Sequence, residues 1–275
     1  MSILVIGEND WSSEEVVLSL SLADLDRHGL MLSQDGGLSV HDGAGEWHSV
    51  DRVLWRAQGA RDAARQHAAL SLVAASSATC VNPADSLHLY GTRLSGHAAL
   101  RKGGLPVIES CSLFGSNAIS YFYTPDFPAV LKVGDWHMGY GKCRANDREA
   151  WNDAIDMAVI ADQFVSVEPL ISYRKDLRIL LVGDDVLAIE RTPASQQWKA
   201  NVCPEETRRV DPPPALTQMT RRAASLLGMQ ILGADWIEDQ SGNWYLLEVN
   251  HAPGLLMEDT DCRPLVLKLL RGSAC

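Results

Sequence analysis

The expected fold is decided near the end of the chain, by the stretch Gly242-Asn243-Trp244-Tyr245-Leu246-Leu247-Glu248-Val249-Asn250-His251-Ala252-Pro253-Gly254. It consists of a turn, an apolar run, and then a carboxylate and a carboxamide two residues apart. Residues at this spacing in a strand point to the same face, so Glu248 and Asn250 would leave the sheet together. Two hard oxygen donors suit Mg²⁺, which often shares its ligands with phosphate. Taken alone, the pattern more often marks a strand with a polar outer face that ends in a loop.

Length and composition indicate an ordinary globular protein. The chain has 275 residues, of which 46% are hydrophobic and 21% charged, enough for a large core and for roughly two domains. Its net charge of -11 argues against broad binding to nucleic acid or to an anionic membrane. The net charge does not exclude a phosphate ligand, because a small basic pocket can lie in an acidic protein. No stretch approaches the ~20 apolar residues of a membrane span.

The N-terminus and the cysteines bear on the compartment. Residues 1–7 have no basic leader, and their apolar run is too short for a secretory signal. The six cysteines are scattered and form no C-x-x-C pair, at positions 80, 111, 143, 203, 262 and 275. Reduced thiols are therefore expected rather than a disulfide framework or a zinc site. Together these features predict a cytoplasmic protein.

The first third of the chain alternates between strand and helix patterns. Ile3-Leu4-Val5-Ile6 is typical of a buried strand, and the apolar spacing from Val16 to Leu25, after Ser12 and Ser13, predicts a helix. A further strand is expected around Leu54, and an Ala-rich helix over residues 60–75. This alternation predicts a small parallel α/β domain over residues 1–88.

The middle of the chain contains a strand, a lysine and a glycine-rich loop. After a helix expected over residues 89–102, residues 127–142 give an apolar strand with Lys132 near its end, followed by Gly134, Gly139 and Gly141. Glycines let backbone N–H groups approach phosphate oxygens. The loop is not a Walker A loop, and as an isolated hairpin it is more often only a turn.

Four pieces then follow one another in order: Lys132 with its glycine loop, Glu168-Pro169-Leu170-Ile171, Asp176-x-Arg178, and Asp235 with Glu248-x-Asn250. Their order and spacing resemble the ATP-grasp superfamily, in the branch that holds the ribosomal-protein-modifying glutamate ligases and the synapsins. The resemblance covers roughly residues 80–270. It implies an α/β chain of the α+β ATP-grasp type. A small N-terminal parallel α/β domain would be followed by two α+β subdomains that clamp ATP, over residues 89–165 with the glycine-rich lid and 166–275.

The resemblance also implies a nucleotide site. Lys132 would reach the α- and β-phosphates, and His137, Gly139 and Gly141 would form the lid over the triphosphate. The adenine would be held by Glu168 and by the backbone at Leu170 and Ile171. Arg93 stands where the family usually has a first lysine, and arginine keeps the charge needed to bind phosphate.

Metal and phosphoryl contacts complete the implied site. Asp235, Glu248 and Asn250 would bind Mg²⁺, as two ions, with Mn²⁺ as an alternative. Stabilising the phosphoryl group or anchoring an anionic substrate is implied for Arg178, Arg191 and Lys199, and Asn201 would lie near the γ-phosphate. Asp176 more often orients Arg178 than reacts. His251, beside the metal residues, is more often structural than a substrate contact.

The implied activity is that of an ATP-dependent carboxylate–amine ligase, which makes an amide or peptide bond through an acyl phosphate and releases ADP and phosphate. Such chemistry needs positioning, Mg²⁺ and cations, and a closing loop that excludes water. The expected partners are small-molecule or peptide carboxylates and amines, without nucleic acid or membrane, and homodimer formation stays open. One alternative is a synapsin-like ATP-binding regulatory module without catalysis. Another is an ATP-grasp ligase that modifies a ribosomal peptide.

Some positions depart from the family pattern. The acid that often contacts the ribose hydroxyls has no clear match, since Ser172 lies in that neighbourhood. Cys203-Pro204 replaces a glycine-rich run that many ligases have after the position of Asn201. The acceptor side of the site is therefore the least defined by sequence.

Overall fold

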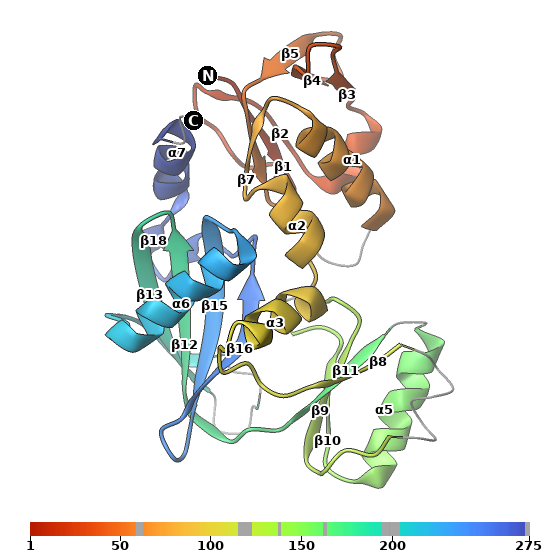
Figure 1. Cartoon of the computed structure of the whole chain (residues 1–275), viewed down its shortest axis with the longest axis vertical. Coiled ribbons are helices and arrows are strands. Elements are labelled where there is room, and N and C mark those ends of the chain that lie inside the picture. The colour runs from red at the N-terminus through yellow and green to blue at the C-terminus, as the bar shows by residue number, and fades with distance from the viewer. Residues whose placement is uncertain are drawn as a thin grey trace.

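The computed structural model describes residues 1–58, 63–114, 123–136, 139–161, 164–193, 198 and 204–272, with only the backbone at residues 22, 26, 193 and 204. The N-terminal elements lie at one end of an elongated molecule and helix α5 lies at the other, with a large antiparallel sheet between them (Figure 1). Within the described residues, no helix is long and apolar enough to cross a membrane. Cys80, Cys111, Cys143 and Cys262 are free thiols.

The N-terminal unit contains the expected parallel sheet, with strand order β2-β1-β6-β7. Its elements are β1 (Ile3–Ile6), β2 (Val16–Leu20), the 3₁₀ helix η1 (Leu22–Asp26), β6 (Arg52–Trp55), α1 (Ala63–Ala75), β7 (Thr79–Val81) and α2 (Ala84–Tyr90). A smaller antiparallel sheet is inserted before β6, from β3 (Leu30–Leu32), β4 (Leu38–His41) and β5 (Trp47–Val50).

The helix predicted over residues 16–25 is wrong. Val16–Leu20 forms β2, which pairs in parallel with β1, and only one short 3₁₀ helix follows it. Val16 and Val17 are β-branched and fit a pleated surface, and pairing with β1 overrides the helical spacing of the apolar residues.

The middle unit is an antiparallel sheet with strand order β10-β9-β11-β8. Its elements are α3 (Arg93–Lys102), β8 (Cys111–Leu113), β9 (Ala129–Val133), β10 (Lys142–Ala145), α5 (Arg148–Ile160) and β11 (Val165–Pro169). Helix α5 covers one face of this sheet, where Trp151 and Ile155 are buried against strand residues such as Leu131 (Figure 1). Helix α3 packs instead on helix α6 (Pro214–Leu227) and strand β16 (Trp244–Asn250), which belong with the large sheet.

The large antiparallel sheet has the strand order β14-β13-β12-β15-β16. Its strands are β12 (Tyr173–Val182), β13 (Asp185–Pro193), β14 (Pro204–Val210), β15 (Ile231–Asp239) and β16 (Trp244–Asn250), and helix α6 (Pro214–Leu227) packs on it. Gly183 and Asp184 form the turn between β12 and β13. Arg208 and Arg209 lie in β14, where they pair with Glu190 and Ile189 of β13.

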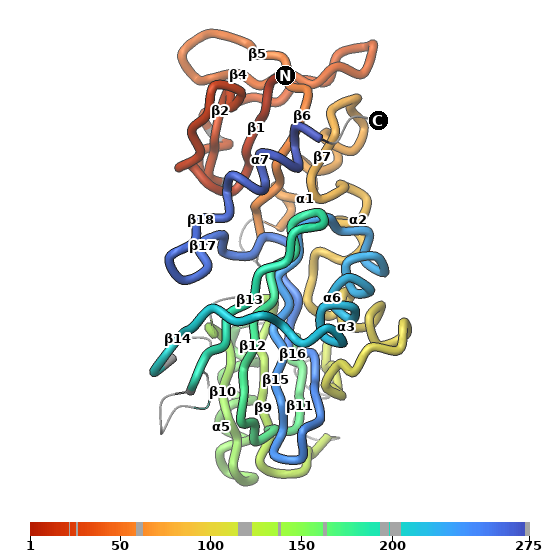
Figure 2. The backbone as a smooth tube through the Cα atoms, turned by 90° about the vertical axis from the view of Figure 1, so that its left-hand side faces the viewer, coloured from red at the N-terminus to blue at the C-terminus, as the bar shows by residue number. Residues whose placement is uncertain are grey.

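The N-terminal sheet and the large sheet share one core. Ile3, Val5 and Leu54 pack with Leu180 and Ile231 in a single cluster of buried side chains. This cluster continues into the last elements, β17 (Leu256–Met257), β18 (Thr260–Asp261) and α7 (Arg263–Gly272). Helix α7 accordingly lies beside the N-terminal unit, far from α5 (Figures 1 and 2).

Asn82 fastens the same junction with hydrogen bonds. Its amide nitrogen donates to the carbonyl oxygens of Ile231 and His251, at 2.8 and 3.1 Å. Its amide oxygen accepts from the backbone N–H groups of Gln230 and Ile231, each at 2.7 Å. The side chain of Asn82 is 1% exposed, so water does not reach it. These hydrogen bonds therefore satisfy polar groups that would otherwise be buried without a partner. The end of the N-terminal sheet is thereby fixed to β15 and to the residue that follows β16.

Candidate functional site

Strand register brings the charged residues of the large sheet into one row. Arg178 of β12 lies opposite Asp235 of β15, and Asp235 lies opposite Glu248 of β16. On the other side of β12, Asp176 lies opposite Arg191 of β13. A bulge at β15–β16 follows immediately after the Asp235–Glu248 pair. Four neighbouring strands therefore place these side chains together at one region of the sheet.

Two arginines hold Asp235. Arg191 donates from its Nη2 to Asp235 at 2.9 Å, and its Nε donates to Asp176 at 2.7 Å. Arg178 lies 3.4 Å from the carboxylate of Asp235. Burial raises the pKa of Asp176 to about 6, although Arg191 acts to lower it. Burial alone would lower the pKa of Arg191, but Asp235 and Asp176 raise it.

A second buried ion pair joins the strands of the middle sheet. The Nζ of Lys132 lies 2.6 Å from the carboxylate oxygens of Glu168, and each side chain is 3% exposed. Burial lowers the pKa of Lys132, while Glu168 acts to raise it. The sequence placed both residues in a nucleotide site, but it did not indicate that they pair with each other.

These two residues line a narrow cavity between the middle and large sheets. This first cavity, of about 60 Å³, is lined by Ile108, Val130, Lys132, Lys142, Glu168, Pro169, Leu170, Ile171, Tyr173, Asp176, Trp198, Ile237 and Leu247. Its walls are mostly apolar, and its ionic groups are the side chains of Lys132, Lys142, Glu168 and Asp176. The backbone N–H of Leu170 donates to the carbonyl of Pro128, so this donor is already used within the protein.

Lys142 was not singled out by the sequence. It begins β10 directly after the glycine loop, and its Nζ lies 2.9 Å from Glu248, with both side chains buried. Gly139 and Gly141 have φ of 78° and 65°, which glycine adopts without strain. A side chain at position 141 would meet the carbonyl of Val133 at 2.7 Å. The loop geometry therefore depends on glycine, and the Gly-Lys pair at its end was the available signal.

Asp235, Glu248 and Asn250 form a donor set that suits Mg²⁺. All three side chains are buried, and carboxylate and amide oxygens are the ligands this ion prefers. In the protein alone, the two carboxylates are compensated by cations, Asp235 by Arg178 and Arg191, and Glu248 by Lys142. The residues fit the ion in type and proximity.

Arg93 lies beside the residues that precede the glycine loop. Its side chain donates to the carbonyl of Gly134 at 2.7 Å, and its backbone N–H donates to Asp135 at 3.0 Å. Its Nε is buried without a partner among the described residues. One turn further along α3, burial and then the positive charge of the neighbouring Lys132 together lower the pKa of His97 to about 3.

The remaining predicted residues are partly described. His137, Lys199 and Asn201 lie outside the described residues. His251 donates from its Nε2 to the carbonyl of Ala57, at 3.2 Å, which connects the end of β16 to the N-terminal unit. The other predicted residues, Lys132, Glu168, Arg178, Arg191, Asp235, Glu248 and Asn250, are near one another across the two sheets as described above.

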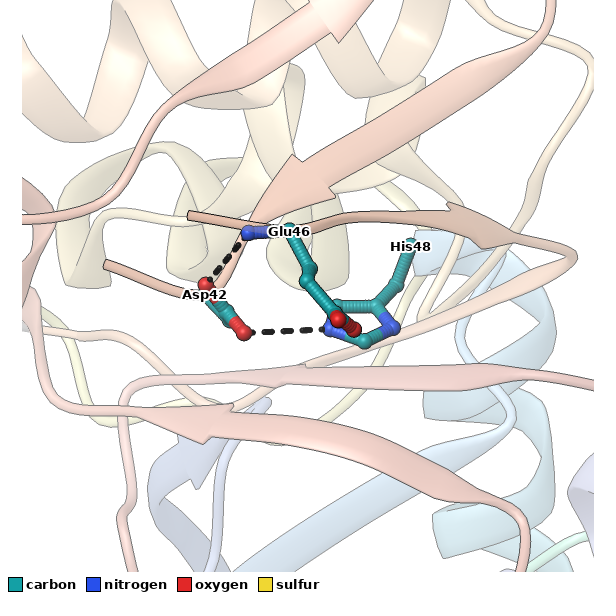
Figure 3. A group of neighbouring side chains, drawn as sticks. All are labelled: Asp42, Glu46 and His48. Atoms are coloured by element: carbon teal, nitrogen blue, oxygen red, sulfur yellow. Dashed lines mark hydrogen bonds and ion pairs between the residues drawn. The ribbon is translucent and has the colours of Figure 1, made fainter. Parts of the chain in front are cut away.

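A separate group of ionisable side chains, Asp42, Glu46 and His48, lies in the hairpin of β4 and β5 (Figure 3). Asp42 accepts hydrogen bonds from the backbone N–H groups of Ala44, Gly45 and Glu46. These bonds lower the pKa of Asp42. The carboxylate of Asp42 therefore stabilises the turn between β4 and β5.

Comparison with known proteins matches this geometry. The family described as "Synapsin, ATP binding domain" matches residues 79–262, which is well over half of the chain. The chain belongs to this family. Its strand and helix arrangement is the ATP-grasp fold, as in the ATP-grasp ligase PsnB complexed with a minimal precursor. The structural alignment with PsnB covers 98% of this chain and 98% of PsnB, with a TM-score of 0.69 and a sequence identity of 19%.

Two curated relatives are similar to this synapsin-domain family member over most of its length. The glutamate–LysW ligase ArgX of Sulfolobus acidocaldarius is 22% identical over 186 residues, which is 63% of this chain and 64% of the ligase. The synapsin of Drosophila melanogaster is 24% identical over 181 residues, which is 64% of this chain and 18% of that synapsin. The chain thus spans less than two thirds of either relative.

Proposed function

We propose that the chain is an ATP- and Mg²⁺-dependent carboxylate–amine ligase. The observation that carries the proposal is the row Arg178–Asp235–Glu248 across three strands, next to Asn250. A metal-binding set and a phosphate-binding arginine are thereby adjacent, as phosphoryl transfer from ATP requires. The glutamate–LysW ligase and PsnB are both named ligases, which supports the same class of reaction.

The first cavity would take the adenine. Ile108, Leu170 and Ile237 offer apolar surface to the ring, and Lys132 stands at the end where the phosphates would begin. The cavity is narrow, at about 60 Å³, so its walls would part as the nucleotide enters. Lys132 would then exchange part of its contact with Glu168 for phosphate oxygens, which frees Glu168 to accept from the adenine amine.

The reaction would proceed in two displacements. A carboxylate oxygen of the acid substrate attacks the γ-phosphorus, the bond to the bridging oxygen breaks, and ADP leaves. The amine nitrogen then attacks the acyl carbon, the carbon–oxygen bond to phosphate breaks, and the nitrogen gives up one proton. Mg²⁺ held by Asp235, Glu248 and Asn250 would offset the negative charge of the transferring group.

The basic residues supply the rest of the charge. As the metal binds Asp235, Arg178 and Arg191 would turn from its carboxylate to the phosphoryl oxygens, and Asp176 would keep Arg191 in position. The loop of Gly139 and Gly141 would close over the acyl phosphate and exclude water, which otherwise hydrolyses it. Lys142, released from Glu248 by the metal, would be available to the triphosphate.

A second candidate function is an ATP-binding module without turnover. The match of residues 79–262 to the synapsin ATP-binding domain favours it. A third is a ligase acting on a ribosomally made peptide, which the fold shared with PsnB, solved with a precursor, favours. These alternatives differ in the acceptor and in turnover, and not in the nucleotide site.

The experiment uses the purified chain with ATP, Mg²⁺ and a panel of carboxylic and amino substrates, including peptides. We expect release of ADP and phosphate that depends on an acid, and trapping of the acyl group by hydroxylamine as a hydroxamate. Glu248→Gln should abolish both, while Arg208→Gln, at an exposed pair on β14, should change neither. Tight ATP binding with no ADP release across the whole panel would contradict the ligase and favour the module.

A further inference from the structure

A second cavity lies at the carboxyl end of the N-terminal parallel sheet. Its volume is about 170 Å³, and its walls include Trp55 at the end of β6, Leu70 of α1, Leu87 of α2, Asp135 of the lid and His251. In open α/β sheets, the carboxyl ends of the strands are where ligands bind. Three parts of the chain, the N-terminal unit, the lid and the end of β16, meet at this place.

The second cavity is connected to the proposed metal residues by strand β16. Leu247 lines the first cavity, and His251, directly after the strand, lines the second. A strand rises about 3.3 Å per residue, so these two residues are about 13 Å apart. Glu248 and Asn250 lie between them. A group attached to the end of a triphosphate in the first cavity would therefore approach the second cavity.

Asp135 defines the charge of the second cavity. The residue is 9% exposed, and its Oδ1 accepts the backbone N–H of Arg93 at 3.0 Å. Within the described residues, Oδ2 has no hydrogen-bond or ion-pair partner. No lysine or arginine lines the cavity in the described part of the chain. A ligand carboxylate would find no permanent cation there, whereas a ligand ammonium would form an ion pair with the buried carboxylate of Asp135.

Part of the wall is apolar, although the side chains of Gln58, Gln66, His67, His88 and His251 also line the cavity. Trp55, Leu70 and Leu87 are each 6% exposed or less and present hydrophobic surface to the cavity. The indole N–H of Trp55 already donates to the carbonyl of Ala57, so the ring offers its apolar body rather than its polar edge. A ligand that pairs with Asp135 and also packs on this apolar surface has an ammonium group and an aliphatic or aromatic part.

We propose that the second cavity is the amine subsite, and that it binds a primary amine with an apolar substituent through an ion pair with Asp135. This inference rests on the proposed ligase function and identifies the class of its second substrate. Asp135 holds the ammonium beside the acyl group near Asn250 and accepts one of its protons, so that the neutral amine nitrogen can attack; the nitrogen loses its second proton as the amide forms.

The test measures binding of three probes of equal shape to the full chain, without ATP or Mg²⁺, by ligand-observed NMR at pH 7. The probes are 3-methylbutylamine, 3-methylbutan-1-ol and 3-methylbutanoate. We expect the amine to bind about tenfold or more tightly than the alcohol, as a charge-assisted pair does relative to a neutral one, and the acid to bind most weakly. Equal binding of the three probes, or preference for the acid, overturns the proposal.

A matched pair of variants locates the binding. Asp135→Asn keeps an oxygen for the N–H of Arg93 and should weaken the amine about tenfold or more, with the alcohol unchanged. Asp153→Asn, at an exposed carboxylate on α5, should change nothing and controls for general attraction to an acidic protein. Unchanged amine binding in folded Asp135→Asn overturns the proposal, and if that variant does not fold, the probe series on the unaltered chain decides.

The same measurements separate this inference from the proposed function. Amine preference that depends on Asp135, in a chain that never releases ADP, would retain the amine site and reject the ligase. Release of ADP and hydroxamate with amine KM unaffected by Asp135→Asn would retain the ligase and reject the amine site.

Discussion

Replacing Lys132 with methionine separates the structural part of its ion pair with Glu168 from its part in binding nucleotide. The pair is 2.6 Å long and both side chains are 3% exposed. Removing one partner of such a pair leaves an uncompensated buried charge and costs about 3–5 kcal/mol. At about 2–4 °C per kcal/mol for a chain of roughly this size, the melting temperature should fall by about 6–20 °C.

The double variant Lys132→Met/Glu168→Met removes both charges at similar volume. Such replacements are often neutral, or stabilising by about 1–4 kcal/mol, so most of the lost stability should return. ATP binding, measured by calorimetry with Mg²⁺, should be strongly weakened in both variants, because both lack the Lys132 ammonium that would contact the phosphates. Thermal melts in the same buffer give the stability of each chain.

Lys175→Met provides the control. Lys175 is 45% exposed and lies 3.7 Å from Glu238, so its loss should cost at most about 1 kcal/mol and leave ATP binding intact. A single variant that melts like the unaltered chain would refute the buried-charge reasoning. ATP binding retained in the double variant would refute the placement of Lys132 in the nucleotide site.

Three further variants test other contacts. Lys142→Met removes the ammonium that is paired with Glu248. It should tighten Mn²⁺ binding to the nucleotide-free chain about tenfold or more, as measured by electron paramagnetic resonance. Unchanged Mn²⁺ affinity would contradict the idea that Lys142 competes with the metal for Glu248. The pKa of His97 is lowered to about 3 in the folded chain. Between about pH 6.5 and pH 3, the unfolded chain therefore binds a proton at His97 that the folded chain does not. The free energy of unfolding should fall as the pH drops through this range, by up to about 1.4 kcal/mol per pH unit. His97→Gln should lose this component in urea midpoints compared across that range, while the opposite contribution of Asp176 is common to both chains. Asn82→Ala strands four backbone groups and should cost about 3 kcal/mol or more in urea unfolding, whereas Ser86→Ala, which loses one exposed bond, should cost under about 1 kcal/mol.

Local patterns in the sequence were sufficient for much of the fold. The spacing of Glu248 and Asn250 predicted a shared face, and both side chains are indeed buried together on β16. The order of four motifs predicted the ATP-grasp fold, which the comparison with PsnB confirms. The parallel N-terminal sheet followed from alternation of strand and helix patterns. The domain boundaries at residues 88 and 165 stay a prediction, as do the roles of the site residues.

What the sequence could not supply depends on pairing between distant strands. The alignment of Arg178 with Asp235 and Glu248 follows from register across β12, β15 and β16, which no local pattern encodes. Val16–Leu20 was assigned to a helix because its apolar spacing suits both structures, and only the neighbouring β1 decides. Asp135 and Lys142 could be recognised as candidate site residues only from their partners Arg93 and Glu248, which lie 42 and 106 residues away in the sequence.

The junction at Asn82 also constrains how the molecule can open. The shared core and the bonds of Asn82 join the N-terminal unit to β15 and β16, and the bonds of Pro106 and Ile108 to Leu246 extend this block to residue 108. The β8–β11 sheet with α5 has a separate core, which contains no residue of the N-terminal unit or of the large sheet among its described members. We therefore expect hinges at residues 109–110 and 171–172, about which this sheet swings as a rigid jaw. Opening by this rigid-body movement would separate Lys142 from Glu248 and Asp135 from Arg93 at the same time. Nucleotide entry and exposure of the amine cavity would then be the same movement.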